Sequence, residues 1–280
     1  MPEPEFHELW LTMMSQMPPR EYSAEVFKTG TGYPWPRPEG SFVLGEGEGR
    51  LLADLEPALQ SELIERFTGP GSGRPPMIAI GSNASPEGLW RKFAHFDDPQ
   101  DRTLLAVSGQ LHDFDVGAAA ELALYGALPA TIFPSSGTRV NATAVWLTDT
   151  QLTQLAWAEI PYWIGRLDTR FEFEPDIARL GPEGLDRALV FVNRFGAFAP
   201  DGHPLALAAI PAENRKVPAL GQVELLEITA RLAVGGDVAP EELVRRAYEA
   251  PEATGHRVTG VMTANAIPFE SSRWTPFPQN

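Results

Sequence analysis

The sequence predicts an α+β protein with a mixed, barrel-like β-sheet flanked by helices. Strand-like runs follow one another from Met77 to Phe198, and only two helical patterns interrupt them. The regular alternation of strands and helices that builds a doubly wound parallel sheet is missing. The 280 residues suffice for one large domain or two smaller ones.

Composition divides the chain into three regions. The stretch GPGSGRPP (69–76) is rich in glycine and proline and is typical of a linker or a long turn. We therefore expect an N-terminal helical and extended region over residues 1–75, a central domain over 76–200 and a C-terminal helical extension over 201–280.

The N-terminal region contains two stripes of apolar residues at helical spacing, from Phe6 to Met17 and from Leu51 to Phe67. Between them lies YPWPRPEGSF (33–42), which we call the strap. Its alternating prolines exclude a helix and favour an extended chain. Because a soluble protein rarely leaves apolar stripes bare, we expect this region to pack on the central domain or on its copy in a homodimer, with the strap at the rim of the functional cavity.

The central region begins with a short strand, Met77 to Ile80, followed by a helix with Ser85 as N-cap. Leu104 to Val116 predicts another strand. Residues 130–134 and 140–148 predict two strands joined by a hairpin turn at SSGTR. A second helix is expected from Asp149, and residues 165–174 and 187–195 predict two more strands. In the last region, 217–232 and 239–250 predict helices, and 265–280 an extended tail.

Charge and composition exclude several classes of protein. With 22 basic and 37 acidic residues the net charge is −15, which argues against binding to nucleic acid or to an anionic membrane surface. The absence of cysteine excludes disulfides, thiolate metal sites and cysteine nucleophiles. The first residues are acidic where a secretory signal is basic, and no run approaches about 20 apolar residues, so a cytoplasmic protein is expected.

Three kinds of active site also lack support. The five histidines are scattered and form no metal-binding pair, and no G-x-S-x-G motif offers a serine nucleophile. GEGEGR (45–50) imitates a dinucleotide-binding loop, but Arg50 stands in place of the third glycine. An acidic turn is the better interpretation.

The stretch IAIGSNASPEGL joins a strand to a helix through Gly81, Ser82 and Asn83. Backbone N–H groups and a helix N-terminus converge there, which favours an anion. The lysine of a nucleotide phosphate loop is missing, so a carboxylate fits better. A purely structural turn is the alternative.

The helix from Asp149 would bury Leu152, Leu155 and Ala156, and the next position on that face is Glu159. Burial raises the pKa of a carboxyl group and can prepare it as a general base. Alternatively, Glu159 is a buried carboxylate paired with Arg166 or Arg170. Both interpretations remain open at this stage.

Taken together, GSNASPEGL, then LPATIFPSSGTRVNATAVWLTDTQLTQL, then AWAE resemble the gamma-glutamylcyclotransferase-like family over roughly Met77 to Glu174. The resemblance implies a small mixed β-barrel flanked by helices. It also implies a cavity for a gamma-glutamyl group and a reaction that needs neither metal nor cofactor. In such a reaction the substrate α-amine attacks its own γ-carbonyl and releases 5-oxoproline.

Carried over residue by residue, the resemblance assigns the catalytic glutamate to Glu159 and the substrate-binding loop to Gly81, Ser82, Asn83 and Ala84. Ile80 and Ala84 replace the tyrosine and leucine of the family loop. Tyr162 and, by strict offset, Arg166 are the candidates for the family tyrosine beyond the glutamate. The remaining alternatives are a non-catalytic member that binds small molecules or proteins, and an amide hydrolase in which Glu159 activates water.

Overall fold

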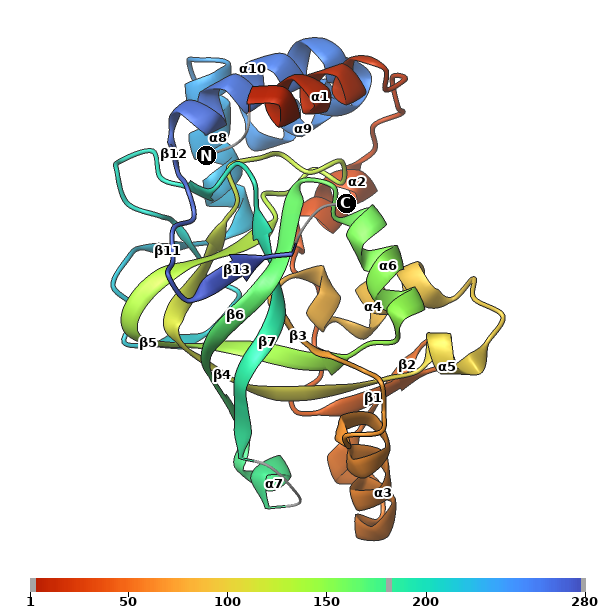
Figure 1. Ribbon diagram of the computed structural model, residues 1–280. Coiled ribbons are helices and arrows are strands. Elements are labelled where there is room, and N and C mark those ends of the chain that lie inside the picture. The colour runs from red at the N-terminus through yellow and green to blue at the C-terminus, as the bar shows by residue number, and fades with distance from the viewer. Residues whose placement is uncertain (1–3, 180–182, 278–280) are drawn as a thin grey trace.

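The centre of the molecule is a closed barrel in which strand order β5-β3-β7-β6-β4 returns to β5 (Figure 1). The structure is a computed structural model that describes residues 4–179 and 183–277. The barrel strands are β3 (Pro76–Ala79), β4 (Leu104–Ala118), β5 (Ala130–Trp146), β6 (Tyr162–Phe173) and β7 (Gly184–Asn193). Strands β3 and β7 are parallel and the other neighbours are antiparallel. The predicted α+β class with a small mixed barrel is thus confirmed.

Short strands from the expected N- and C-terminal regions extend this sheet. They are β1 (Phe42–Gly45), β2 (Glu48–Leu51), β9 (Ala206–Leu207), β10 (Ala212–Glu213), β11 (Ala219–Leu220) and β13 (Trp274–Pro276). A separate pair consists of β8 (Ala197–Phe198) and β12 (Ala266–Ile267). Within GEGEGR, Glu46 and Gly47 form the turn between β1 and β2, both with positive φ, and the flanking residues belong to the two strands. All three expected regions therefore contribute strands to one sheet.

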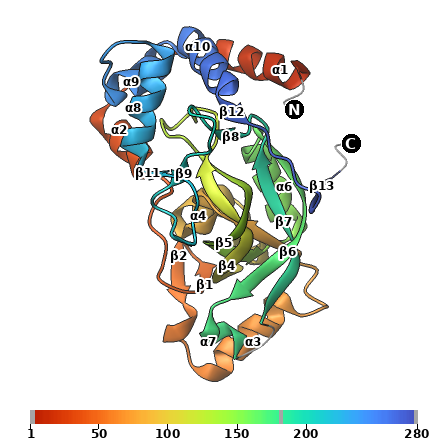
Figure 2. The ribbon, with the colours of Figure 1, turned by 90° about the vertical axis from the view of Figure 1, so that its left-hand side faces the viewer.

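Helices cover both ends and one side of the barrel (Figures 1 and 2). They are α1 (Pro4–Ser15), α2 (Ala24–Thr31), α3 (Pro57–Thr68), α4 (Pro86–Phe93), α5 (Pro99–Arg102), α6 (Asp149–Ala158), α7 (Pro175–Ala178), α8 (Gln222–Ala233), α9 (Pro240–Glu249) and α10 (Pro251–Ala264). Helices α1, α8, α9 and α10 gather at one end, α3 lies at the other, and α4 and α6 flank the side. The sequence did not predict α2 or α10. Helix α10 contains Gly255 and Gly260 and owes its stability to packing against α1, α8 and α9.

Strand β5 corrects one prediction. Its two halves do not form a hairpin, because both pair with β4 in one antiparallel ladder, Phe114 with Pro134 and His112 with Arg139. The residues between them form a bulge at Gly137, whose φ is +80° and whose N–H donates to Asp113 Oδ1 at 2.8 Å. The bulge lets one long strand bend around the barrel.

At the start of β4 both faces are buried, which explains the apolar run of residues 104–107. Leu105 and Val107 belong to the main core inside the barrel. Leu104 and Ala106 belong to a second core that includes the inner face of α4. Over these four residues the period-2 alternation of the strand therefore separates two cores.

The N-terminal helix packs on the rest of the molecule through Phe6, Trp10 and Met14, which are all buried. The rings of Phe6 and Trp10 lie 5.6 and 5.9 Å from the ring of Phe195. Leu9, which the apolar spacing placed in the stripe, is 53% exposed. Residues 1–3 of the expected N-terminal region and 278–280 of the expected tail lie outside the described residues.

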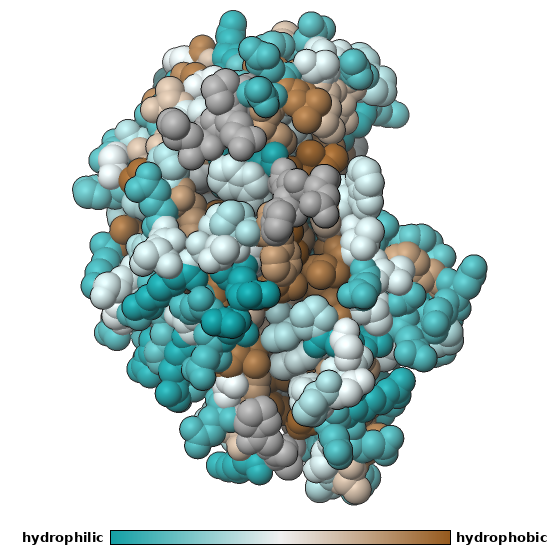
Figure 3. Space-filling view, viewed as in Figure 1, coloured by the Kyte–Doolittle hydropathy of each residue, from teal (hydrophilic) through white to brown (hydrophobic). Residues whose placement is uncertain are grey.

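The surface in Figure 3 is mostly polar, and hydrophobic residues reach it between the β6–β7 strands and α6. An open hollow of about 350 Å³ lies there, lined by residues that include Leu152, Trp157 and Phe277. Among the described helices, none is both long enough and apolar enough to cross a membrane.

A buried ion pair ties the C-terminal region to the barrel. Asp115 on β4 is fully buried and accepts two hydrogen bonds of 2.9 Å from the Arg215 guanidinium. Arg215 also donates to the carbonyl of Ile210 at 2.7 Å, and the N–H of Val116 donates to Asp115 at 2.8 Å. The pair is almost completely satisfied, so its loss would leave an unpaired carboxylate in the core.

We expect Arg215→Met to lower the free energy of unfolding by about 3–5 kcal/mol, measured by chemical denaturation. The control is Arg187→Met, which removes the exposed ion pair to Asp168 and should cost no more than about 1 kcal/mol. Equal losses for the two variants would contradict this prediction.

Candidate functional site

The Gly-Ser-Asn loop connects β3 to α4 at the rim of the barrel. Ser82–Ala84 form one 3-10 turn, closed by the Ala84 N–H donating to the Gly81 carbonyl at 3.0 Å. Ser85 then caps α4, because its hydroxyl accepts from the Gly88 N–H at 3.0 Å. The predicted N-cap is thus confirmed, and the loop is held firmly between strand and helix.

Helix α6 brings Glu159 to this loop. The end of β5 pairs with the start of β3, so α6 begins near the start of β3 and runs back beside it. Ten helical residues span about 15 Å, and the four residues of β3 span about 13 Å. The C-cap residue Glu159 therefore lies level with the loop after β3. The buried side chains of α6 are Gln151 and Leu155, whereas Ala156, expected on that face, is exposed.

A hydrogen-bonded network joins Glu159, Asn83 and Lys92. Asn83 Nδ2 donates to Glu159 Oε1 at 3.0 Å, and Lys92 Nζ donates to the same oxygen at 2.8 Å. Lys92 Nζ also donates to Asn83 Oδ1 at 2.6 Å. The ion-pair partner of Glu159 is therefore Lys92 and not Arg166 or Arg170. Within the described residues, Glu159 Oε2 has no hydrogen-bond partner.

Sequence reasoning missed Lys92. Its signal was its position on α4, three residues after Leu89 and directly before Phe93, both of which are fully buried. A lysine beside the buried face of a short helix indicates a partner inside the fold. The Lys92 and Glu159 side chains are only 19% and 17% exposed.

Glu159 and the loop face one cavity of about 220 Å³. Its lining includes Gly81, Ser82, Asn83, Lys92, Glu159 and Tyr162. Two tryptophans that could have filled this space lie elsewhere. Trp157 is 74% exposed, and Trp163 packs against the ring of Trp274 at 6.3 Å.

Two of the predicted site residues lie outside this cavity. Ala84 is fully buried, and its N–H is already used by the Gly81 carbonyl. Arg166 is exposed on β6, with its guanidinium 5.8 Å from the ring centre of Phe277. Of the two candidates beyond the glutamate, only Tyr162 lines the cavity.

Tyr33 of the strap forms one wall of the site cavity, together with Tyr125 and Tyr162. Tyr33 is buried, and its hydroxyl oxygen accepts the Ala130 N–H at 2.9 Å, with the Ser82 N–H also directed at it. Tyr162 donates its hydroxyl to the Ala130 carbonyl at 3.0 Å. Tyr125 stacks on Tyr33 at 5.6 Å. Burial raises the pKa of all three phenols, so each is a neutral hydroxyl at physiological pH.

A second carboxyl group, Glu121, is buried near Tyr162. It is 3% exposed, and its Oε2 has no hydrogen-bond partner among the described residues. Burial and then the charge of Glu159 raise the pKa of Glu121 to about 8, against a smaller opposing effect of the Asn193 side chain. The sequence signal was a single acid inside the small and apolar stretch GAAAELALYG (117–126).

Metal ligands do not gather in this site. Over residues 4–179 and 183–277, no group of three or more His, Asp or Glu side chains is arranged to hold a metal ion.

Comparisons with known proteins return structural neighbours but no sequence family. No protein-family model matches the chain, and no curated protein matches it significantly. A protein from Arabidopsis thaliana, known from its solution structure, has 17% identity and a TM-score of 0.33, covering 43% of this chain and 62% of that one. A gamma-glutamyl cyclotransferase has 16% identity and a TM-score of 0.31, covering 43% and 66%.

A third neighbour is an uncharacterized protein from Homo sapiens, with 16% identity, a TM-score of 0.30 and coverage of 43% and 67%. The chain spans less than two thirds of the length of the first two neighbours. The solved structures similar to this chain thus include a gamma-glutamyl cyclotransferase, from the family that the sequence resembles.

Glu121 should make stability depend on pH. Its pKa in the folded state, about 8, lies above the ordinary value of 4.5. The folded state therefore holds the proton more tightly, and stability is lost at up to about 1.4 kcal/mol per pH unit as the pH rises through this interval. We expect Glu121→Gln, which cannot ionise, to match the parent near pH 5 and to be more stable at pH 9 in urea unfolding. The exposed control Glu62→Gln should follow the parent at both pH values.

Gly81 should tolerate no side chain. A Cβ atom at this position would lie 2.2 Å from the Tyr33 hydroxyl oxygen. We expect Gly81→Ala to push Tyr33 off the Ala130 N–H and to lower the melting temperature in calorimetry. Gly71→Ala is the control, because a Cβ there meets nothing within 4 Å. A melting temperature of Gly81→Ala as high as that of the control would show that the strap does not press on the loop.

Proposed function

We propose that this protein is a cyclotransferase that cleaves a gamma-glutamyl amide or peptide and releases 5-oxoproline. The observation that carries the proposal is the meeting of the Glu159 carboxylate and the Gly81–Asn83 loop in one small cavity. A volume of about 220 Å³ suits a single small group such as a glutamyl moiety.

Binding would place the glutamyl α-carboxylate at the loop. Within the described residues the N–H of Asn83 has no hydrogen-bond acceptor, so it is free to donate to a carboxylate. The positive charge of Lys92 adds to the attraction for an anion. The hydroxyls of Tyr33 and Tyr162 already contact Ala130 and fix the shape of the wall.

The reaction would then be an internal ring closure. The substrate α-amine attacks the γ-carbonyl carbon, and the free oxygen of Glu159, Oε2, accepts the proton that the amine loses. When the tetrahedral intermediate collapses, the C–N bond to the leaving amine breaks and that nitrogen takes the proton. Because both reacting groups belong to one molecule, the site has to orient them and move one proton.

Lys92 would also affect the protonation of the attacking amine. Its ammonium group lies 2.8 Å from Glu159 Oε1, beside the position proposed for the substrate amine. A neighbouring positive charge disfavours a second one and lowers the pKa of the substrate ammonium. Lys92 would thereby increase the fraction of substrate present as the nucleophilic free amine.

Glu159→Gln tests the proposal. The amide has nearly the shape of the carboxylate but cannot accept the proton, so we expect a loss of activity of roughly a hundredfold or more. The assay measures 5-oxoproline from gamma-glutamyl amines, gamma-glutamyl dipeptides and glutathione. Glu62→Gln, on the exposed face of α3, is the control and should keep full activity. A Glu159→Gln variant with full activity would remove this residue from the mechanism.

A non-catalytic binding module is the second candidate, and one observation favours it. Asn83 and Lys92 both occupy Glu159 Oε1, so the network is stable without a ligand. In that case none of the gamma-glutamyl compounds in the assay would give 5-oxoproline, while calorimetry would still detect binding of one of them. Release of free glutamate in place of 5-oxoproline would instead indicate an amide hydrolase that uses Glu159 to activate water.

A further inference from the structure

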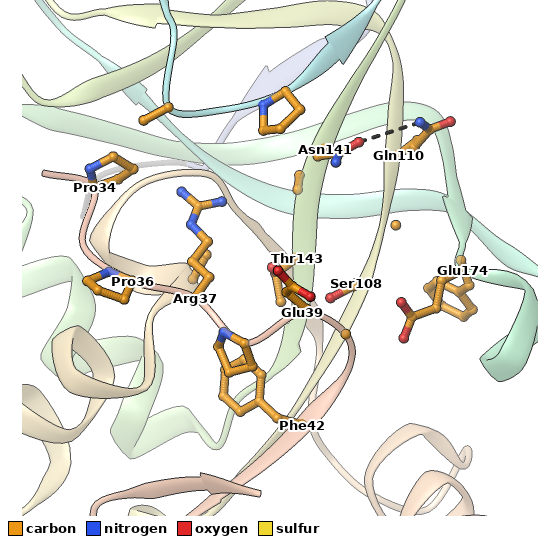
Figure 4. Close-up of a pocket in the computed structure, with 18 of the residues that line it drawn as sticks. Pro34, Pro36, Arg37, Glu39, Phe42, Ser108, Gln110, Asn141, Thr143 and Glu174 are labelled. Atoms are coloured by element: carbon orange, nitrogen blue, oxygen red, sulfur yellow. Dashed lines mark hydrogen bonds between the residues drawn. The ribbon is translucent and has the colours of Figure 1, made fainter. Parts of the chain in front are cut away.

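A cavity larger than the one at Glu159 is lined in part by the strap. It has a volume of about 910 Å³, compared with 220 Å³ for the site cavity. The strap forms one wall, and β4, β5 and the end of β6 form the others (Figure 4). Its size lies in the upper part of the range for small-molecule sites.

Arg37 of the strap projects into this cavity (Figure 4). Its Nη2 donates to the carbonyl oxygens of Ile80 and, at 3.3 Å, Gly81. No carboxylate of the described residues pairs with it, and its Nε and Nη1 have no acceptor there. Burial lowers the pKa of the Arg37 guanidinium. A desolvated guanidinium with free donors facing a cavity is suited to bind a carboxylate.

Two acidic side chains, one on the strap and one on the opposite side, also line this cavity. Figure 4 shows the Glu39 carboxylate near the middle of the cavity, beside Thr143, and the Glu174 carboxylate on the side away from Arg37. Glu174 Oε1 accepts the Ser41 N–H at 2.9 Å, whereas Glu39 is exposed and has no ion-pair partner in the described part of the chain. The cavity therefore has a positive end and a negative end.

The other two charged residues of the lining already have partners. Arg139 pairs with Glu213, and Glu172 lies 3.7 Å from Arg170. They add little net charge to the cavity, so Arg37, Glu39 and Glu174 determine which ligand charges it would favour.

The walls between the two ends carry apolar side chains together with the polar Ser108, Gln110, Asn141 and Thr143. The apolar ones include the aromatic rings of Trp35, Phe42 and Phe173 and several proline rings. Such walls favour apolar groups between the charged ends of a ligand. The cavity is also about four times as large as the site cavity, so a single amino acid would leave most of it empty.

We propose that this cavity binds a short peptide with free termini, its carboxylate on Arg37 and its ammonium group at Glu39 and Glu174. The site is distinct from the one at Glu159, and the proposal does not depend on the reaction proposed there.

Calorimetric titration of the full chain with three forms of alanyl-phenylalanine tests the proposal. The probes are the free dipeptide, its C-terminal amide, which lacks the carboxylate, and its N-acetyl form, which lacks the ammonium group. We expect the free dipeptide to bind and each modified form to bind about tenfold more weakly.

Two variants assign the ends of the ligand. Arg37→Met should weaken the binding of the free and N-acetyl dipeptides by about tenfold and leave the affinity for the C-terminal amide unchanged. Glu39→Gln should weaken the binding of the free dipeptide and of the amide, and leave the affinity for the N-acetyl form unchanged. Glu39 is preferred to Glu174 because the latter also holds Ser41 in place. Arg50→Met is the control, since it removes the same charge from an exposed position outside the cavity.

This pattern separates binding from a purely structural role. A variant that only loosened the strap would weaken all three probes alike, and that outcome would overturn the proposal. Absence of binding of the free dipeptide at millimolar concentration, or equal affinity for the free dipeptide and its amide, would also overturn it. If Arg37→Met fails to fold, the response of Glu39→Gln to the three probes decides alone.

Discussion

The architecture of this protein depends on strand β5 pairing with two partners. Along its length β5 forms a ladder with β4, and its last four residues pair with β3, which closes the barrel. Closure places the end of β3 at the rim and makes α6 return along β3. The loop at Gly81 and the carboxylate at Glu159 are therefore brought together by the barrel itself.

At that rim the electrostatic balance is set by a few partly buried charges. Lys92 pairs with Glu159, and Asn83 bonds to both, so this carboxyl group has polar partners in a site that is mostly shielded from water. Glu121 has no such partner and takes up a proton instead, as the upward shift of its pKa indicates. The two carboxyl groups thus differ in their surroundings, because only Glu159 has a partner of opposite charge.

The strap links the two cavities of the molecule. Tyr33 presses on Gly81 from the side of the smaller cavity, and Arg37 holds the carbonyls of Ile80 and Gly81 from the larger one. The prolines between these residues restrict the conformers of the unfolded strap, so ordering it costs less entropy. A short segment outside the barrel strands therefore shapes both proposed binding sites.

Elements whose signals lie within a few neighbouring residues could be predicted from the amino-acid sequence. The N-cap at Ser85, the start of α6 and most of the strands follow from capping residues and apolar periodicity. The loop at Gly81–Asn83 and the placement of Glu159 at a helix end were predictable for the same reason. Tertiary structure alone decided that residues 130–146 form one bulged strand and not a hairpin, because β4 pairs with both halves. It also decided that Lys92 is the partner of Glu159, that Arg166 faces away and that α10 is stable, since each depends on contacts between segments far apart in the chain.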